Sequence, residues 1–180
     1  MKSLIRFCGL LTAVLVFGVV AATTLNANTA VRSQAEEIRH QIVMSPYYGV
    51  FDWIDVERPS AVEVVLQGQV REPYAKSDIE SRIRKIEGVA KVVNKIEVLP
   101  VSTSDDAIRV ATYRAIFRYN SPLFRYSRPI NPSIHILVKN GRVTLKGVVS
   151  DTGDRQLAFF AARYVPGVFE VNNELTVGKV

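Results

Sequence analysis

The chain has 180 residues and a formal net charge of +6. Its 48% hydrophobic and 22% charged residues are typical of a globular protein and exclude general disorder. One cysteine and two histidines exclude an internal disulfide and leave no ligand set for a structural zinc site.

The first thirty residues predict a targeting segment. Lys2 and Arg6 are the only charges among them, and an apolar run follows from Phe7 to Ala22. This order is typical of an export signal. An uncleaved N-terminal anchor stays open as the alternative, because the run extended to Leu25 is nearly long enough to span a bilayer. We therefore expect residues 1–30 to be an export signal or anchor, and the protein to be periplasmic or otherwise exported.

The next part of the chain, residues 31–99, predicts one small domain. Its expected elements are a helix over 29–44, strands over 53–58 and 62–70, a helix over 77–86 and a strand over 89–99. Residues 100–104 are a short linker.

Residues 105–178 predict a second domain of the same kind. Its expected elements are a helix over 105–119, strands over 134–139 and 142–149, a helix over 151–165 and a strand over 168–177. Asn140-Gly141 between the first two strands is typical of a two-residue hairpin turn. The expected inward face of the second helix is Leu157, Ala158, Ala161 and Ala162.

The two domains are copies of one unit. Residues 62–70 align with 141–149, and 88–98 align with 167–177, at the same offset, which pairs Gly68 with Gly147. A glycine inside a strand usually marks a bulge or a close backbone approach. The predicted fold class is therefore α+β, with two tandem α-β-β-α-β domains, each a small three-stranded sheet with two helices on one face. Each core is small, so we expect the two domains to dock on each other.

The second copy carries a recognisable motif. Its hairpin reads NG-x-V-x-L-x-G-x-V from Asn140 to Val149, and an alanine-rich helix and GV-x-x-V-x-N-x-x-x-V follow. This resembles the BON domain, a family named after bacterial osmotically induced and nodulation proteins. The resemblance covers residues 31–178 as two copies, although Pro59-Ser60 replaces the Asn-Gly turn in the first. It implies an exported, non-enzymatic envelope protein with affinity for phospholipid membranes and a role in envelope integrity or osmotic stress tolerance.

No catalytic, metal or cofactor site is expected. His40 and His135 stand apart from any serine, cysteine or carboxylate at a catalytic spacing. One acidic group invites acid–base chemistry, and its members are Asp52, Asp55, Glu57 and Glu63. We interpret them as alternating residues on the solvent face of a hairpin, and keep an enzyme that uses them as a separate hypothesis.

The segment from Arg109 to Arg128 predicts a binding surface. On a helix, Val110, Tyr113 and Phe117 lie opposite the inward face and are flanked by arginines. Aromatic side chains edged by arginines suit the headgroup layer of an anionic membrane. The alternative is that the aromatic residues pack against the first copy or a second molecule. The predicted lipid-binding residues are Arg109, Val110, Tyr113, Arg114, Phe117, Arg118, Phe124, Arg125 and Arg128.

The charge is divided unequally between the copies. Residues 31–100 hold 10 basic and 11 acidic side chains, a net charge of −1, whereas residues 101–180 hold 11 and 6, a net charge of +5. The second copy is therefore expected to meet an anionic phospholipid surface. Nucleic acid is excluded as a partner by the export signal. A protein–protein interaction module of the cell envelope without lipid binding is the alternative function.

Overall fold

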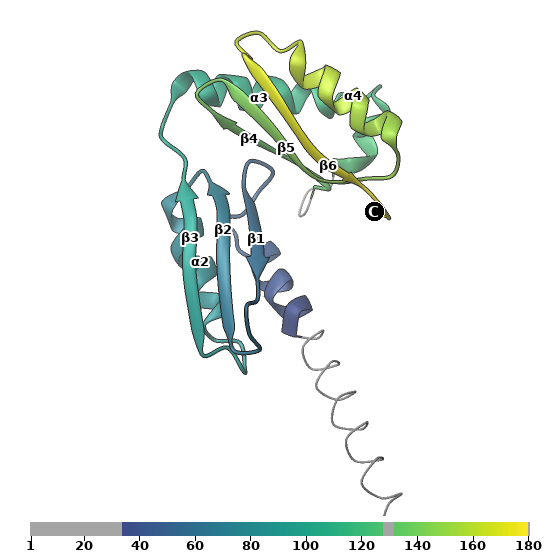
Figure 1. The fold of residues 1–180 in the computed structure, drawn as a ribbon. Helices are drawn as coiled ribbons and strands as arrows, with labels where there is room; N and C mark the ends of the chain where they lie inside the picture. Colours follow the sequence, from purple (N-terminus) through teal and green to yellow (C-terminus); the bar gives the residue numbers. More distant parts are fainter. Residues whose placement is uncertain (1–33, 128–131, 180) are drawn as a thin grey trace, which may run out of the picture.

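The computed structural model describes residues 34–127 and 132–179 (Figure 1). These residues form two three-stranded sheets with helices, which confirms the α+β fold with two tandem domains. The first domain contains a helix at residues 34–43, then β1 (Trp53–Glu57), β2 (Glu63–Val70), α2 (Pro73–Ile83) and β3 (Lys91–Val98). The second contains α3 (Thr103–Ile116), the 3₁₀ helix η1 (Pro122–Tyr126), β4 (Ile134–Lys139), β5 (Arg142–Val149), α4 (Thr152–Arg163) and β6 (Glu170–Val177). The predicted targeting segment, residues 1–30, lies outside the described residues.

The two sheets have the same topology. In each, the middle strand pairs antiparallel with the strand before it and parallel with the last strand, in the orders β1-β2-β3 and β4-β5-β6. The apolar residues of the central strand alternate, so one face of each sheet packs against its two helices and forms a core. The first core joins Ile38 and Ile79 from the two helices to Leu66 of β2.

Several predicted boundaries need correction. α2 begins at Pro73 rather than at residue 77, because proline is well suited to the first turn of a helix. α3 begins at Thr103, inside the predicted linker, because Ser102 caps the helix by accepting a hydrogen bond from the amide of Asp105. α3 ends at Ile116 instead of residue 119, and η1 follows where a loop was expected.

The repeated glycine is explained by a close backbone approach. Gly68 and Gly147 have φ angles of +135° and +122°. A Cβ atom would lie 2.1 Å from the carbonyl oxygen of Trp53 in the first domain and 2.0 Å from that of Ser133 in the second. No side chain fits either position, which is why both copies keep glycine there.

The second hairpin turns as predicted. Asn140 and Gly141 have φ angles of +53° and +72°, which agree with a type I′ turn, and Lys139 pairs directly with Arg142. In the first hairpin the last pair is Glu57 with Val65, so a longer connection replaces the two-residue turn.

The first domain contacts the second through the residues just before β1. The amide of Ile136 on β4 donates to the carbonyl oxygen of Val50 at 2.8 Å. Nδ1 of His135 lies 3.2 Å from the carbonyl oxygen of Gly49. Val50 and Phe51 also pack against the core of the second domain. The edge of β4 is thereby covered by the first domain.

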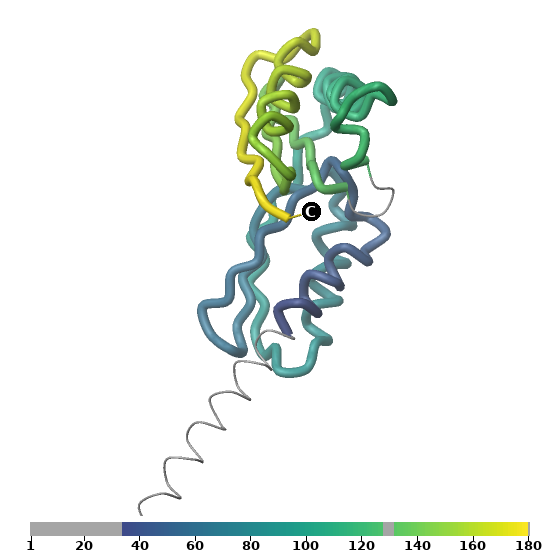
Figure 2. Tube along the Cα trace, turned by 90° about the vertical axis from the view of Figure 1, so that its right-hand side faces the viewer, coloured from purple at the N-terminus to yellow at the C-terminus, as the bar shows by residue number. Residues whose placement is uncertain are grey.

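The first domain contacts the open face of the second sheet and, through Phe51, one side of α3. His135 and Lys146 are cross-strand partners on the face of the sheet that carries no helix, and Lys146 pairs with Asp55 of the first domain at 3.4 Å. α3 and α4 cover the other face and lie side by side at the far end of the molecule (Figure 2). Among the described residues, no helix is long and apolar enough to cross a membrane.

Candidate membrane-binding surface

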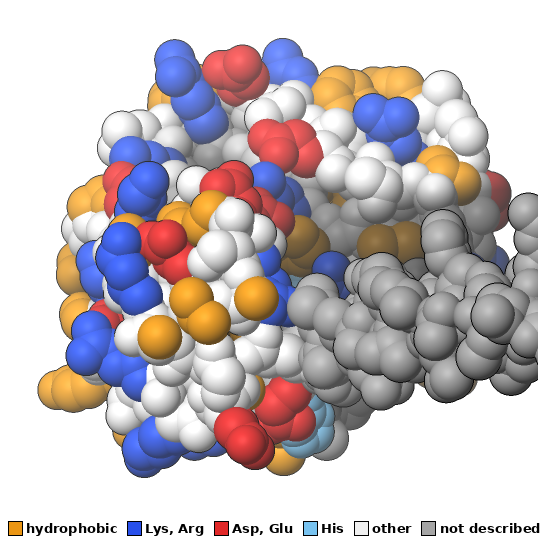
Figure 3. Space-filling view, turned by 60° about the horizontal axis from the view of Figure 1, so that its bottom comes forward, with side chains coloured by type: hydrophobic (Ala, Val, Ile, Leu, Met, Phe, Trp, Pro, Cys, Tyr) orange, Lys and Arg blue, Asp and Glu red, His pale blue; other side chains and the backbone are white. Residues whose placement is uncertain are grey.

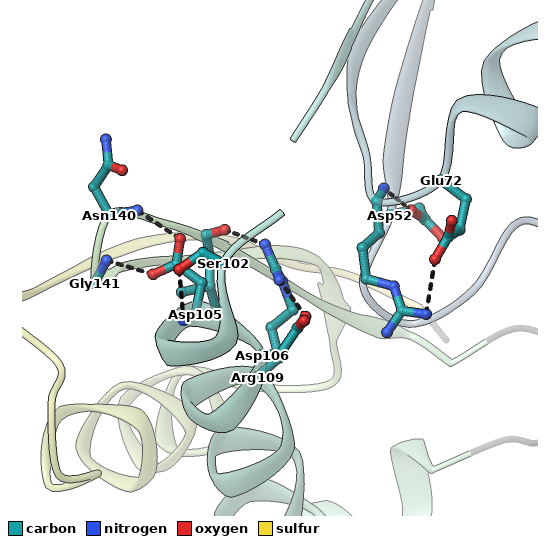
Figure 4. Close-up of polar contacts among 10 residues, drawn as sticks. Asp52, Glu72, Ser102, Asp105, Asp106, Arg109, Asn140 and Gly141 are labelled. Carbon is teal, nitrogen blue, oxygen red and sulfur yellow. Dashed lines mark hydrogen bonds and ion pairs between the residues drawn. The ribbon is translucent and has the colours of Figure 1, made fainter. Parts of the chain in front are cut away.

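Arg109 is inside the protein, so its predicted role as a lipid contact is wrong. Its side chain is 2% exposed and reaches across α3 toward β4. Nη1 binds Asp106 Oδ1 at 2.6 Å, and Nη2 donates to the carbonyl oxygen of Val138 at 2.6 Å (Figure 4). The guanidinium therefore joins α3 to β4 instead of facing solvent.

Phe117 is also buried, which corrects its predicted place on the outer face. It is 6% exposed and belongs to the core of the second domain. The same core includes Leu123 and Tyr126 of η1, which folds back after the end of α3. A helical projection of the sequence cannot show that a later segment folds back over this residue.

Tyr113 lies partly between the two domains. Its ring centre is 5.0 Å from that of Phe117 and 6.2 Å from that of Phe51 in the first domain. Packing between the domains was the alternative to lipid binding in the sequence analysis. It therefore accounts for much of the burial of the Tyr113 ring. The side chain is still 38% exposed.

At its η1 end, the predicted lipid-binding surface is only partly accessible to a ligand. Phe124 is 44% exposed and packs against Tyr119, with ring centres 5.4 Å apart. Arg125 is ion-paired with Asp154 and, at 3.5 Å, with Asp151, so its charge is already balanced within the domain. Arg128 lies outside the described residues.

Besides Tyr113, three of the predicted residues keep an exposed position on or next to α3. Val110 is 42% exposed, and Arg114 and Arg118 are also exposed. Neither of these two arginines makes an ion pair with any residue that the structure describes. Within the described part of the chain they are therefore cations without an ion-pair partner, with Arg114 in the last turn of α3 and Arg118 just after the helix.

The structure adds an exposed apolar stripe on α4 that the sequence prediction missed. Leu157, Phe160 and Tyr164 are 38%, 50% and 81% exposed. Leu157 was expected to face inward but is exposed, whereas Ala158 and Ala162 are buried and Ala161 packs against the core. The spacing of the three residues was a visible signal, since positions three and seven apart share one side of a helix.

The acidic group of Asp52, Asp55, Glu57 and Glu63 does not lie together on the solvent face of a hairpin. Asp52 is buried, contrary to its predicted place on a solvent face, and burial raises its pKa. It accepts hydrogen bonds from the amides of Gly49 at 2.8 Å and Arg71 at 2.6 Å. Asp55 instead faces Lys146 of the other domain. No group of three or more potential metal ligands occurs in residues 34–127 and 132–179.

The surface at the free end of the first domain is mixed in charge. Figure 3 shows basic and acidic side chains interspersed there, with hydrophobic side chains in small separate groups. Several of the basic side chains of this domain are paired, including Arg84 with Glu80 and Lys91 with Glu63. This end of the first domain therefore carries no surface of a single sign of charge among its described residues.

Comparison with known proteins identifies the repeat. A sequence model of the BON domain matches residues 30–100 and 121–179. The comparison with curated proteins finds no match. Among solved structures, the C-terminal domain of CdsD, a structural protein of the type III secretion system of Chlamydia trachomatis, is 13% identical, and the alignment covers 80% of this chain and 96% of that one with a TM-score of 0.28. A second CdsD structure is 13% identical over 81% of this chain and 93% of that one, with the same TM-score of 0.28.

Proposed function

Since the chain belongs to the BON domain family, we propose that it is an exported, non-enzymatic envelope protein whose second domain binds anionic phospholipid membranes. Such binding would support envelope integrity or osmotic stress tolerance. The observation that carries the proposal is the pair of exposed arginines, Arg114 and Arg118, which have no ion-pair partner among the described residues.

The distribution of charge around these arginines favours an anionic partner. In α3 and α4 the acidic residues all lie in the first turn, where they stabilise the helix N-terminus. They are also engaged, Asp106 with Arg109 and Asp154 with Arg125. Beyond the first turn the charged side chains of both helices are arginines. A lipid phosphate approaching this layer therefore meets positive charge with little opposing negative charge.

The experiment is co-sedimentation of the protein with vesicles of phosphatidylcholine, with and without phosphatidylglycerol. We expect binding only to the anionic vesicles, and weaker binding as salt is raised. Replacing Arg114 and Arg118 together by alanine should reduce the partition coefficient about thirtyfold, because each basic residue near such a surface contributes roughly 1 kcal/mol.

A matched control removes the same charge elsewhere. Arg71 and Arg84 are exposed arginines of the first domain, paired with Glu72 and Glu80. Their double alanine variant should bind like the wild type. Equal losses of vesicle binding in both double variants would mean that binding depends on the net charge of the protein and not on Arg114 and Arg118. Failure of the wild-type protein to bind anionic vesicles would contradict the proposal and leave the protein–protein interaction module as the function to test.

A further inference from the structure

The apolar stripe on α4 is not explained by lipid binding through arginines alone. Leu157, Phe160 and Tyr164 present one apolar, two-ring surface to solvent. Side chains of this kind exposed in a row usually mark an interaction site. The fully buried Ala158 and Ala162 complete the core beneath, so the stripe is not required for packing on the sheet.

Leu157 lies on the side of α4 nearer to α3, whereas the ring of Phe160 packs against that of Phe159, with ring centres 5.5 Å apart. α3 packs over β4, and α4 packs over β5 and β6, so the two helices are neighbours in one layer. Arg155, about 200° around the helix from Leu157, is held at the β6 edge, where the amide of the Asn173 side chain donates to its carbonyl oxygen at 2.8 Å. The side that carries Leu157 therefore points away from β6 and toward α3, where Val110 and Arg114 are exposed.

The stripe is also free of the first domain. Contacts from the first domain reach β4, β5 and Tyr113, through Gly49, Val50, Phe51 and Asp55. No ring contact, hydrogen bond or ion pair joins the described part of the first domain to Leu157, Phe160 or Tyr164. Within the described residues, the first domain thus contacts α3 through Tyr113 but makes none of these contacts with the three residues of the stripe.

We infer that α4 supplies the apolar half of the membrane contact, with Leu157, Phe160 and Tyr164 entering the interfacial region of an anionic bilayer beside Arg114 and Arg118. This rests on the proposed function and adds to it the depth and the residues of the contact. The chemistry that fits the surface is a bilayer interface, because apolar side chains bind the headgroup–acyl boundary while neighbouring arginines bind phosphates. Tyrosine at the edge of the stripe suits this boundary, where one end of the ring is apolar and the other is hydrated.

A depth-sensitive probe tests this directly. Trp53 is the single tryptophan of the chain, so a Trp53→Phe, Phe160→Trp variant reports on α4 alone. In anionic vesicles that contain brominated phospholipid, its fluorescence should be quenched relative to vesicles without bromine. The control is Trp53→Phe, Tyr74→Trp, because Tyr74 is a 68% exposed aromatic residue of the first domain. The control should show no quenching.

A second measurement separates this inference from the proposed function. The triple variant Leu157→Ser, Phe160→Ser, Tyr164→Ser should fold normally by circular dichroism, since all three side chains are exposed. Its partition into anionic vesicles should fall roughly tenfold or more. The inference would be overturned if the triple variant bound like the wild type and tryptophan at position 160 showed no quenching. The proposed function would still stand if binding were lost when Arg114 and Arg118 are replaced. Absence of wild-type binding would overturn both.

Discussion

Asp105 joins the start of α3 to the second hairpin through one carboxylate. Its side chain is 2% exposed, and its two oxygens accept hydrogen bonds from the amides of Asn140 at 2.9 Å and Gly141 at 2.8 Å (Figure 4). Gly141 is buried, so its amide needs a hydrogen-bond acceptor within the protein. A single acidic residue therefore fixes the turn and the helix relative to each other.

Replacing Asp105 by alanine should lower the free energy of unfolding by about 2 kcal/mol, because the buried amide of Gly141 and the partly buried amide of Asn140 lose their acceptor. Asp105→Asn keeps one acceptor oxygen and should cost about half as much. Urea denaturation followed by circular dichroism measures both. A loss no larger for alanine than for asparagine would contradict the role assigned to the carboxylate.

At the scale of elements, a repeated asparagine ties the outer strand of each sheet to the helix beside it. In β6, Oδ1 of Asn173 accepts from the amide of Leu175 at 3.3 Å, while its Nδ2 donates to the carbonyl oxygen of Arg155 in α4 at 2.8 Å. Asn94 does the same in β3, with the amide of Ile96 at 3.1 Å and the carbonyl oxygen of Lys76 at 3.1 Å. Each asparagine thus accepts a hydrogen bond from a backbone amide of an edge strand, which would otherwise be open to pairing with another strand.

Asn173→Ala should destabilise the protein by roughly 1 kcal/mol and accelerate hydrogen exchange at the amide of Leu175. The neighbouring Asn172 offers a matched control, because its side chain points to Glu174 and not to α4. Asn172→Ala should leave the exchange rate of Leu175 unchanged. Equal exchange rates in the two variants would argue that Asn173 does not protect the edge.

The strands and the second hairpin could be predicted because their signals are local. β4 and β5 follow from alternating apolar residues around an Asn-Gly turn, and the repeated glycine marks a close approach within one hairpin. The buried Arg109 and Phe117 could not be predicted in this way. A helical projection has one inward direction, whereas α3 is also covered by η1 and by residues 50–51 of the other domain.

At the scale of the whole molecule, His135 stands at the contact between the two domains. Its ring lies 5.1 Å from that of Trp53 and 5.6 Å from that of Tyr48, both from the first domain. Burial lowers its pKa. Beside it, burial raises the pKa of Asp52, the buried acid of the same contact. The contact between the two domains therefore favours the neutral form of the His135 imidazole.

Because the pKa of His135 is lower in the folded protein, the unfolded chain binds the proton more readily. The stability contributed by neutral His135 is complete above its ordinary pKa of about 6.5 and is lost as the pH falls below it. Thermal denaturation should show a smaller loss of stability below this pH in His135→Gln than in the wild type. His40→Gln, which alters an exposed histidine, should keep the wild-type pH dependence. An identical pH dependence in all three proteins would contradict the prediction. The raised pKa of Asp52 changes stability with pH in the opposite direction, so the difference between the proteins isolates the histidine.

Binding of this protein to anionic phospholipid membranes is tested most directly by the salt dependence of vesicle binding by the unmodified protein. We predict co-sedimentation with phosphatidylglycerol-containing vesicles that decreases steadily as salt is raised, together with no pelleting on phosphatidylcholine alone. Equal pelleting on both kinds of vesicle, or none on either, would contradict it.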